Sequence, residues 1–124
     1  MANTLYLTLN ARFLIEGETV PLTLLQVSND TQSITSNLMA AGIQNIGTSA
    51  ENLDFGAVTT EGYACFKNLD ATNFVEIGWD ATGFQSALKL LAGQSAIVPL
   101  NPARTWQAKA DTAAIDLQFA VIGV

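Results

Sequence analysis

Apolar and polar residues alternate along much of the chain with a period of two. From Leu5 to Ile15 nearly every second residue is apolar, the residues between them are mainly polar, and Leu14 alone breaks the pattern. Successive side chains of a β-strand point to opposite faces, so this alternation predicts a strand with one buried face. The same pattern recurs from Phe74 to Trp79 and from Ile115 to Val121. Both ends and the middle of the chain are therefore expected to be β-structure.

Turn residues separate further apolar runs. Glu16-Gly17-Glu18 predicts a turn, and Leu22 to Val27 predicts a strand that ends at Ser28-Asn29-Asp30. From Thr31 to Asn52 no period is sustained, and we interpret this stretch as strand and loop. Additional short strands are expected over Leu53 to Val58, Tyr63 to Asn68, Ile97 to Val98 and Arg104 to Lys109.

One segment is ambiguous between helix and strand. Phe84, Ala87, Leu88 and Leu91 stand at helical spacing, whereas Leu88 and Leu90 also fit one face of a strand. Periodicity alone leaves both readings open.

About eight short strands, with turn signals about every 8 to 12 residues, are typical of a β-sandwich or small barrel. A length of 124 residues fits one domain. We therefore predict an all-β, single-domain β-sandwich over residues 1–124, with residues 1–15 able to extend from it as an N-terminal strand or arm.

Few charges are available to cover the surface of this domain. Asp, Glu, Lys and Arg make up 13% of the chain and apolar residues 49%, against about 25% charged residues in ordinary soluble domains. Much of the surface must then be Thr, Asn, Ser, Gln and Ala, and we expect neighbouring subunits to cover part of it. The net charge of −6 repels a phosphate backbone, so nucleic acid is not an expected partner.

The sequence excludes several kinds of catalytic and targeting signal. Histidine is absent and Cys65 is the single cysteine, which rules out Ser-His-Asp and Cys-His catalysis and most zinc sites. Cys65 itself is expected to be a small buried hydrophobe. A single cysteine cannot form an intrachain disulfide, so we expect the protein to be made in the cytoplasm. No apolar run is long enough to span a membrane, and the N-terminal residues lack a signal peptide, so we expect the whole chain to be the mature protein.

Two alternatives involve carboxylates. Asn68, Asp70 and Thr72 place oxygen atoms at alternate positions as a calcium loop does, but Asn73 stands where that loop needs glycine and Trp79 where it needs the closing acid. We interpret these residues as a hydrogen-bonded turn instead. A glycosidase pair could be drawn from four acids that no spacing selects: Glu16, Glu18, Glu61 and Glu76. We expect neither metal nor cofactor.

The aromatic residues and the few cations are candidates for contacts. Trp79 shares a predicted strand face with Val75 and Ile77, so it is expected in the core, whereas Trp106 lies among small and polar residues and is a candidate interface anchor. Arg104 and Lys109 are candidates for pairing with acids of a neighbour, with surface ion pairs of small energy as the alternative.

Two segments resemble a known group of proteins. The run EGYACFKNLDATNFVEIG at residues 61–78 and the run AKADTAAIDL at residues 108–117 are similar to segments of small virion structural proteins of tailed bacteriophages, as is LKLLAG at residues 88–93. The resemblance covers the second half of the chain well and residues 46–53 loosely.

This resemblance implies a jelly-roll-like sandwich that is assembled into a virion. The expected role is a capsid cement protein, not an enzyme, that bridges subunits of the major capsid protein as a homotrimer on the capsid surface. A tail-associated receptor- or carbohydrate-binding module is the alternative. The expected interface residues are Leu5, Leu7, Leu9, Tyr63, Phe84, Arg104, Trp106 and Lys109.

Overall fold

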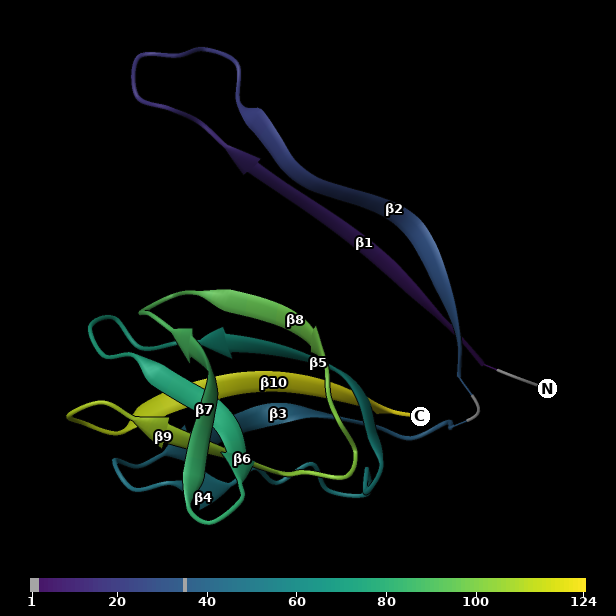
Figure 1. Ribbon diagram of the computed structural model, residues 1–124, viewed down its shortest axis with the longest axis vertical. Helices are drawn as coiled ribbons and strands as arrows, with labels where there is room; N and C mark the ends of the chain where they lie inside the picture. The colour runs from purple at the N-terminus through teal and green to yellow at the C-terminus, as the bar shows by residue number, and fades with distance from the viewer. Residues whose placement is uncertain (1–2, 35) are drawn as a thin grey trace. The chain divides into compact units, whose positions relative to one another are not determined.

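The computed structural model describes residues 3–34 and 36–124 (Figure 1). Within these residues the protein is all-β, as predicted, with ten strands and no helix. The chain divides into two compact units, Met1–Ser36 and Asn37–Val124, where the sequence predicts a single domain. No described helix is long and apolar enough to cross a membrane.

The first unit is an antiparallel hairpin of β1 (Asn3–Phe13) and β2 (Leu22–Ile34). The predicted turn at Glu16-Gly17-Glu18 is confirmed, since the Glu18 N–H donates to the Ile15 carbonyl at 3.0 Å. Gly17 has φ of 89°, a conformation that glycine adopts without steric cost. Strand β2 is longer than predicted, because Ser28-Asn29-Asp30 does not end it.

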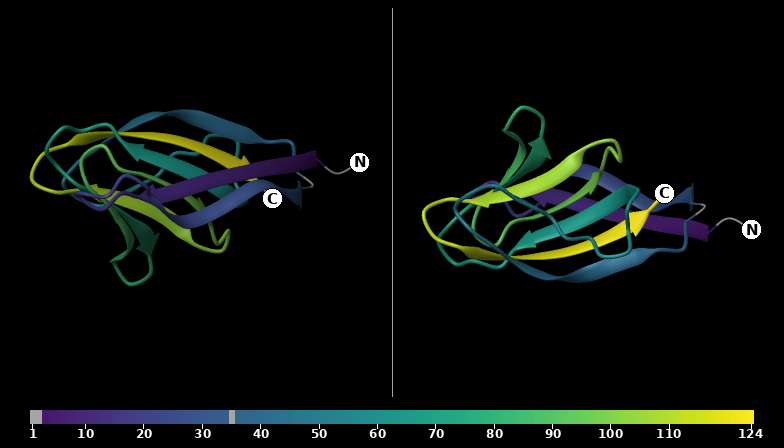
Figure 2. Two further views of the ribbon diagram at one scale, coloured as in Figure 1. Left: turned by 90° about the horizontal axis from the view of Figure 1, so that it is seen from above. Right: turned by 90° about the horizontal axis from the view of Figure 1, so that it is seen from below.

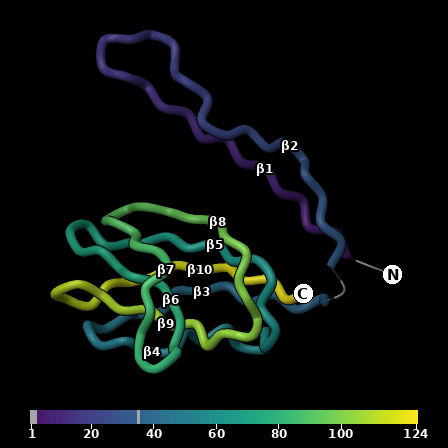
Figure 3. The backbone as a smooth tube through the Cα atoms, viewed as in Figure 1, coloured from purple at the N-terminus to yellow at the C-terminus, as the bar shows by residue number. Residues whose placement is uncertain are grey.

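The second unit contains eight strands. They are β3 (Met39–Ile46), β4 (Glu51–Asn52), β5 (Glu61–Asn68), β6 (Val75–Asp80), β7 (Phe84–Leu90), β8 (Ser95–Pro99), β9 (Thr105–Ala110) and β10 (Ile115–Gly123). Their path can be followed as a tube in Figure 3.

These eight strands form two four-stranded antiparallel sheets. One sheet has the order β3-β10-β5-β8 and the other β4-β9-β6-β7, and their curvature is visible in Figure 2. All connections except β6–β7 pass from one sheet to the other, which gives the eight-stranded jelly roll. The predicted β-sandwich is confirmed, but the prediction counted about eight strands over the whole chain, and the described residues form ten.

The core lies between the two sheets. Its largest fully buried apolar side chains come from both: Phe66, Ile46, Ile115, Leu117 and Val121 from the first sheet, and Ile77 and Val75 from the second. In β10, residues from Ile115 to Val121 alternate strictly between buried and more exposed positions, so the sequence pattern correctly predicts which residues face inward.

Two predictions of local structure need correction or resolution. Leu53 to Val58 was expected as a strand, but β4 ends at Asn52 and the run is an irregular loop whose Leu53, Phe55 and Val58 are buried. The apolar spacing there reflects anchoring of a loop to the core. Phe84 to Leu90 is strand β7, which settles the ambiguous segment in favour of a strand.

Candidate functional site

The outer face of the β3-β10-β5-β8 sheet carries several exposed apolar side chains. Strand alternation turns the side chains opposite to the core outward, and cross-strand pairing places them in rows. The central row is Ala41, Ala120, Cys65 and Ile97. One flanking row is Met39, Ile122, Tyr63 and Pro99, and the other is Ile43, Gln118, Lys67 and Ser95. We call these twelve side chains the outer face.

Large side chains at the rim of the outer face are open to solvent. Met39 is 69% exposed, Ile43 60% and Ile97 39%. Sheets of a sandwich need one apolar face only, so apolar residues on the second face require another explanation. The outer face is thus a candidate contact surface.

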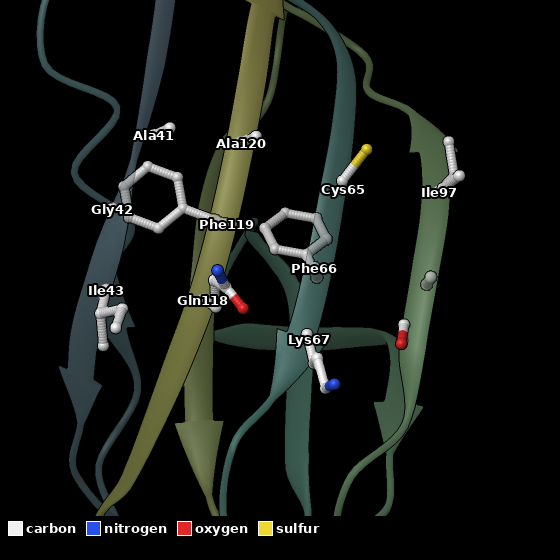
Figure 4. Close-up of a pocket in the computed structure, with 12 residues that line it drawn as sticks. Ala41, Gly42, Ile43, Cys65, Phe66, Lys67, Ile97, Gln118, Phe119 and Ala120 are labelled. Carbon is white, nitrogen blue, oxygen red and sulfur yellow. The ribbon is translucent and has the colours of Figure 1, made fainter.

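Small residues make the centre of this face a shallow groove of about 720 Å³. Ala41, Ala120 and Cys65 carry short side chains, whereas Ile43, Ile97 and Lys67 stand around them. Figure 4 shows these residues spread over four adjacent strands. This groove can accept branched or aromatic side chains that protrude from a partner, whereas a flat partner surface would not fill it.

Cys65 corrects a sequence prediction. It was expected to be buried, but its thiol is exposed on the outer face. The reason is strand parity: the neighbours Ala64 and Phe66 take the two inward positions, with 0% and 2% exposure, which leaves Cys65 pointing out. Lys67, two residues on, points to the same side and is the only charged member of the outer face as defined above.

The hairpin carries a second apolar surface. Strand β1 is regular, so Leu5, Leu7, Leu9, Ala11 and Phe13 share one face. Directly opposite them in β2 stand Gln32, Asp30, Val27, Leu25 and Leu22. The other face of the hairpin is polar, with Thr4, Tyr6, Thr8, Asn10 and Arg12 in β1. We call the apolar β1 residues, together with the β2 residues directly opposite them, the hairpin face.

Two irregularities in β2 preserve this amphipathic pattern. The register slips by one residue between Leu7 and Leu9 and again between Ala11 and Arg12, with the extra residue in β2 each time. Asn29, at the first slip, has φ of 53°, a left-handed conformation that asparagine tolerates. Each bulge restores apolar β2 residues to the hairpin face, which a uniform alternation would not do.

The expected interface residues occur in both units of the chain. Leu5, Leu7 and Leu9 are half-buried on the hairpin face, and Tyr63 is half-buried on the outer face. Phe84 begins β7 on the other sheet. Within the jelly roll, Tyr63 and Phe84 therefore lie on different sheets.

Trp106 and Arg104 have partners within the jelly roll. The Trp106 ring packs edge-on against Trp79 with centroids 6.0 Å apart, and its indole N–H donates to the Asn101 carbonyl at 2.9 Å. The Arg104 guanidinium lies over the Trp79 ring, 5.2 Å from its centroid. Trp79 was expected in the core with Val75 and Ile77. Val75 and Ile77 are both 0% exposed, whereas Trp79, near the end of the same strand, is half-buried.

Lys109 lies in a row of alternating charge on the second sheet. Its cross-strand neighbour is Glu76, whose other neighbour is Lys89. Lys89 also lies 3.9 Å above the centroid of the Phe74 ring. This row favours the ordinary reading of Lys109 as part of a charged strand face.

The Asn68–Asn73 loop is a hydrogen-bonded turn. The Asp70 carboxylate accepts the N–H groups of Asn73 at 2.6 Å and Thr72 at 3.0 Å. These bonds lower the pKa of Asp70 below its ordinary value of 3.8, with the Asn73 N–H as the largest cause. Asn68, Asp70 and Asn73 each have a side-chain oxygen that accepts a hydrogen bond from a protein donor. No group of three metal-ligating side chains occurs among the described residues.

The hairpin turn, β5 and β6 carry the four acids considered for glycoside hydrolysis. Glu16 and Glu18 belong to the hairpin turn, Glu61 lies on β5 and Glu76 on β6 of the opposite sheet. A second, more polar hollow of about 330 Å³ lies beside Trp106, and its walls include Glu61, Arg104 and Asn52.

Sequence reasoning missed most of the outer face. Met39, Ala41 and Ile43 lie in the stretch that showed no sustained period, although these three residues do alternate with Ala40 and Gly42. The signal was hidden because small residues at 40 to 42 give no contrast between the two faces. Pairing across four strands, which no local pattern encodes, assembles the face.

Comparison of the chain with models of known protein families, with curated protein sequences and with solved structures finds no match.

Proposed function

We propose that this chain is a structural virion protein of a tailed bacteriophage, acting as a capsid cement protein that bridges subunits of the major capsid protein. The observation that carries the proposal is the exposed apolar surface, present on both the outer face and the hairpin. Soluble monomers rarely expose contiguous apolar patches larger than about a few hundred Å², so extended exposed apolar surface is typical of an assembly component.

The hairpin adds weight to this proposal. Among residues 3–34, Ile34 is the only buried side chain, whereas Phe13, Leu22 and Leu25 are each more than half exposed. A two-stranded hairpin is at best marginally stable in water without a layer packed on it. In an assembly, each apolar side chain that becomes buried contributes about 1.5–3 kcal/mol, less the cost of association.

The resemblance of residues 61–78 and 108–117 to phage virion proteins supports the same conclusion. A cement protein needs no catalytic centre, and its work is the sum of many identical contacts. A contact of about 1,600 Å² per copy is enough for specific binding. The few charges of the chain suit an interface core, from which charged residues are depleted.

Purified mature particles provide the test. Quantitative mass spectrometry should find the chain at hundreds of copies per particle, and shells assembled without it should bind the added protein at a saturating stoichiometry. Absence of the chain from particles would refute the virion role. A handful of copies per particle would refute the capsid location and favour the tail.

A second candidate function rests on the polar hollow beside Trp106. Aromatic, acidic and amide side chains around a hollow are a combination that can bind a sugar, as a tail-associated receptor-binding module would require. A glycan array with the purified protein separates the two functions, because a cement protein should bind shells and no sugar.

A further inference from the structure

We propose that the hairpin of one copy packs its apolar face onto the outer face of the jelly roll of a neighbouring copy, forming a third sheet layer there. The proposal rests on the assembly function given above and specifies the contact between copies. Three independent features of the two surfaces lead to it.

The two surfaces are complementary in shape. The hairpin face presents large side chains, among them Leu7, Leu9, Phe13 and Leu25, on a narrow two-stranded ridge. The outer face offers a groove whose centre is Ala41, Ala120 and Cys65. Large residues opposite small ones are how stacked sheets interdigitate.

The lengths agree as well. At about 3.3 Å per residue, β1 with its 11 residues spans about 36 Å. At the same rise, β10 with its nine residues, which runs through the centre of the sheet, spans about 30 Å. One hairpin can therefore follow a central strand along its whole length.

Each surface carries one charge, and the charges are opposite. Asp30 is the one residue of the hairpin face that is charged at neutral pH, and Lys67 is the one such residue of the outer face; Asp116 of β10 lies one row beyond it, bonded to Asn45. Two copies of the same surface would bring like charges together, whereas the hairpin face on the outer face pairs them. Charge pairing of this kind fixes register and suppresses the wrong contact.

This contact joins two different surfaces, so it is heterologous. Heterologous contacts generate a closed ring when the rotation between copies allows it, and an open filament when it does not. A ring of three, as the resemblance implies, is one closed arrangement that such a contact allows.

Chemical cross-linking of the full-length protein tests the proposal, because Cys65 is the only native thiol and lies in the central row of the groove. Cys65 is one row from Lys67, and Leu5 and Leu9 are each one row from Asp30 on the hairpin. If Asp30 faces Lys67, either Leu5 or Leu9 faces Cys65, depending on the strand direction. Stacked sheets lie about 10 Å apart, which a short bismaleimide can bridge.

The variants Leu5→Cys and Leu9→Cys should therefore differ. We expect one of them to give interchain products on a denaturing gel, at a yield at least about tenfold above wild type. The control Tyr6→Cys places a thiol on the polar face of the same hairpin and should stay at the wild-type level. Products confined to a single chain, or equal yields from all three variants, would overturn the proposal.

Charge exchange gives a second measurement that does not depend on a thiol. Asp30→Lys and Lys67→Glu should each raise the dissociation constant of the oligomer about tenfold in sedimentation experiments, and the double variant should recover most of the loss. No recovery in the double variant would overturn the charge pairing.

The outcomes separate this inference from the proposed function. Cross-linked oligomers of a chain that is absent from particles would refute the virion role and leave the contact intact. A chain that decorates shells but gives no interchain product would refute the contact between copies and leave the virion role intact.

Discussion

The side-chain amide of Asn68 donates a hydrogen bond to the backbone carbonyl of Asn73 at 2.8 Å. The same amide reaches the carbonyls of Leu90 at 3.1 Å and Leu91 at 3.3 Å, and its oxygen accepts the Asp70 N–H at 3.0 Å. Asn68 has 0% exposure and is the only buried polar side chain among the described residues. It therefore joins the end of β5 to two loops through bonds that no apolar residue could make.

Replacing Asn68 should destabilise the jelly roll strongly. In Asn68→Ala, carbonyl groups that now accept buried hydrogen bonds lose their donor, and the expected loss is about 2–4 kcal/mol in the free energy of unfolding. Urea unfolding measures it. The control is Asn45→Ala, which removes an exposed amide bonded to the Asp116 carboxylate and should cost under about 1 kcal/mol. Equal losses in the two variants would contradict the role given to burial.

Asp70 gives the protein an acid-sensitive contribution to stability. Its pKa is lower in the folded protein than the ordinary 3.8, because the N–H groups of Asn73 and Thr72 bond to the carboxylate. The contribution is fully present above the ordinary value and is lost as the pH falls through the folded pKa. Near neutral pH, wild type should have a higher melting temperature than Asp70→Asn. This gap in melting temperature should narrow below the ordinary pKa of the Asp70 carboxyl group. Thermal unfolding at a series of pH values measures the gap, and a gap that widens in acid would be inconsistent with this account.

Gly78 is required by a close approach of two strands. A Cβ atom added at Gly78 would overlap the carbonyl oxygen of Gln85, at the bulge where β6 and β7 change register. Gly78→Ala should therefore lower the free energy of unfolding by about 1–3 kcal/mol. At Gly42 the added Cβ would make an ordinary contact at 3.7 Å with the Phe119 ring, so Gly42→Ala should be tolerated. Comparable melting temperatures for the two variants would disprove the steric explanation.

The fold class could be predicted from the sequence because it depends on a local property. Alternation places Ile115, Leu117 and Val121 on one side of their strand whatever pairs with it, and the structure confirms that they are buried. The prediction failed at Ser28-Asn29-Asp30. These residue types are typical of a strand end, but Asn29 tolerates φ of 53°, which lets the strand continue through a bulge.

The candidate site was harder to predict because it is made by strand order. Ala41, Ala120 and Cys65 are distant in sequence and meet only because β10 lies between β3 and β5. Each is a small residue without a chemical signature. Cys65 in particular was assigned to the core from its residue type, and only the alternation of Ala64 and Phe66 could have placed it outside.

The tip of the hairpin is where we expect the major capsid protein to bind. Val20 is 76% exposed there, and Leu14 and Ile15 beside the turn are 57% and 46% exposed. These residues lie beyond the last paired residues of β1 and β2, so they stay available when the hairpin face is covered. Val20→Glu places a charge in the proposed contact, and binding to undecorated shells should weaken at least about tenfold. The melting temperature should not change, because an exposed side chain contributes little to folding.

The control Thr82→Glu adds the same charge at an exposed turn between β6 and β7 and should bind as wild type does. Co-sedimentation with shells measures both, and a Val20→Glu protein that binds as tightly as Thr82→Glu would exclude the hairpin tip from the capsid contact.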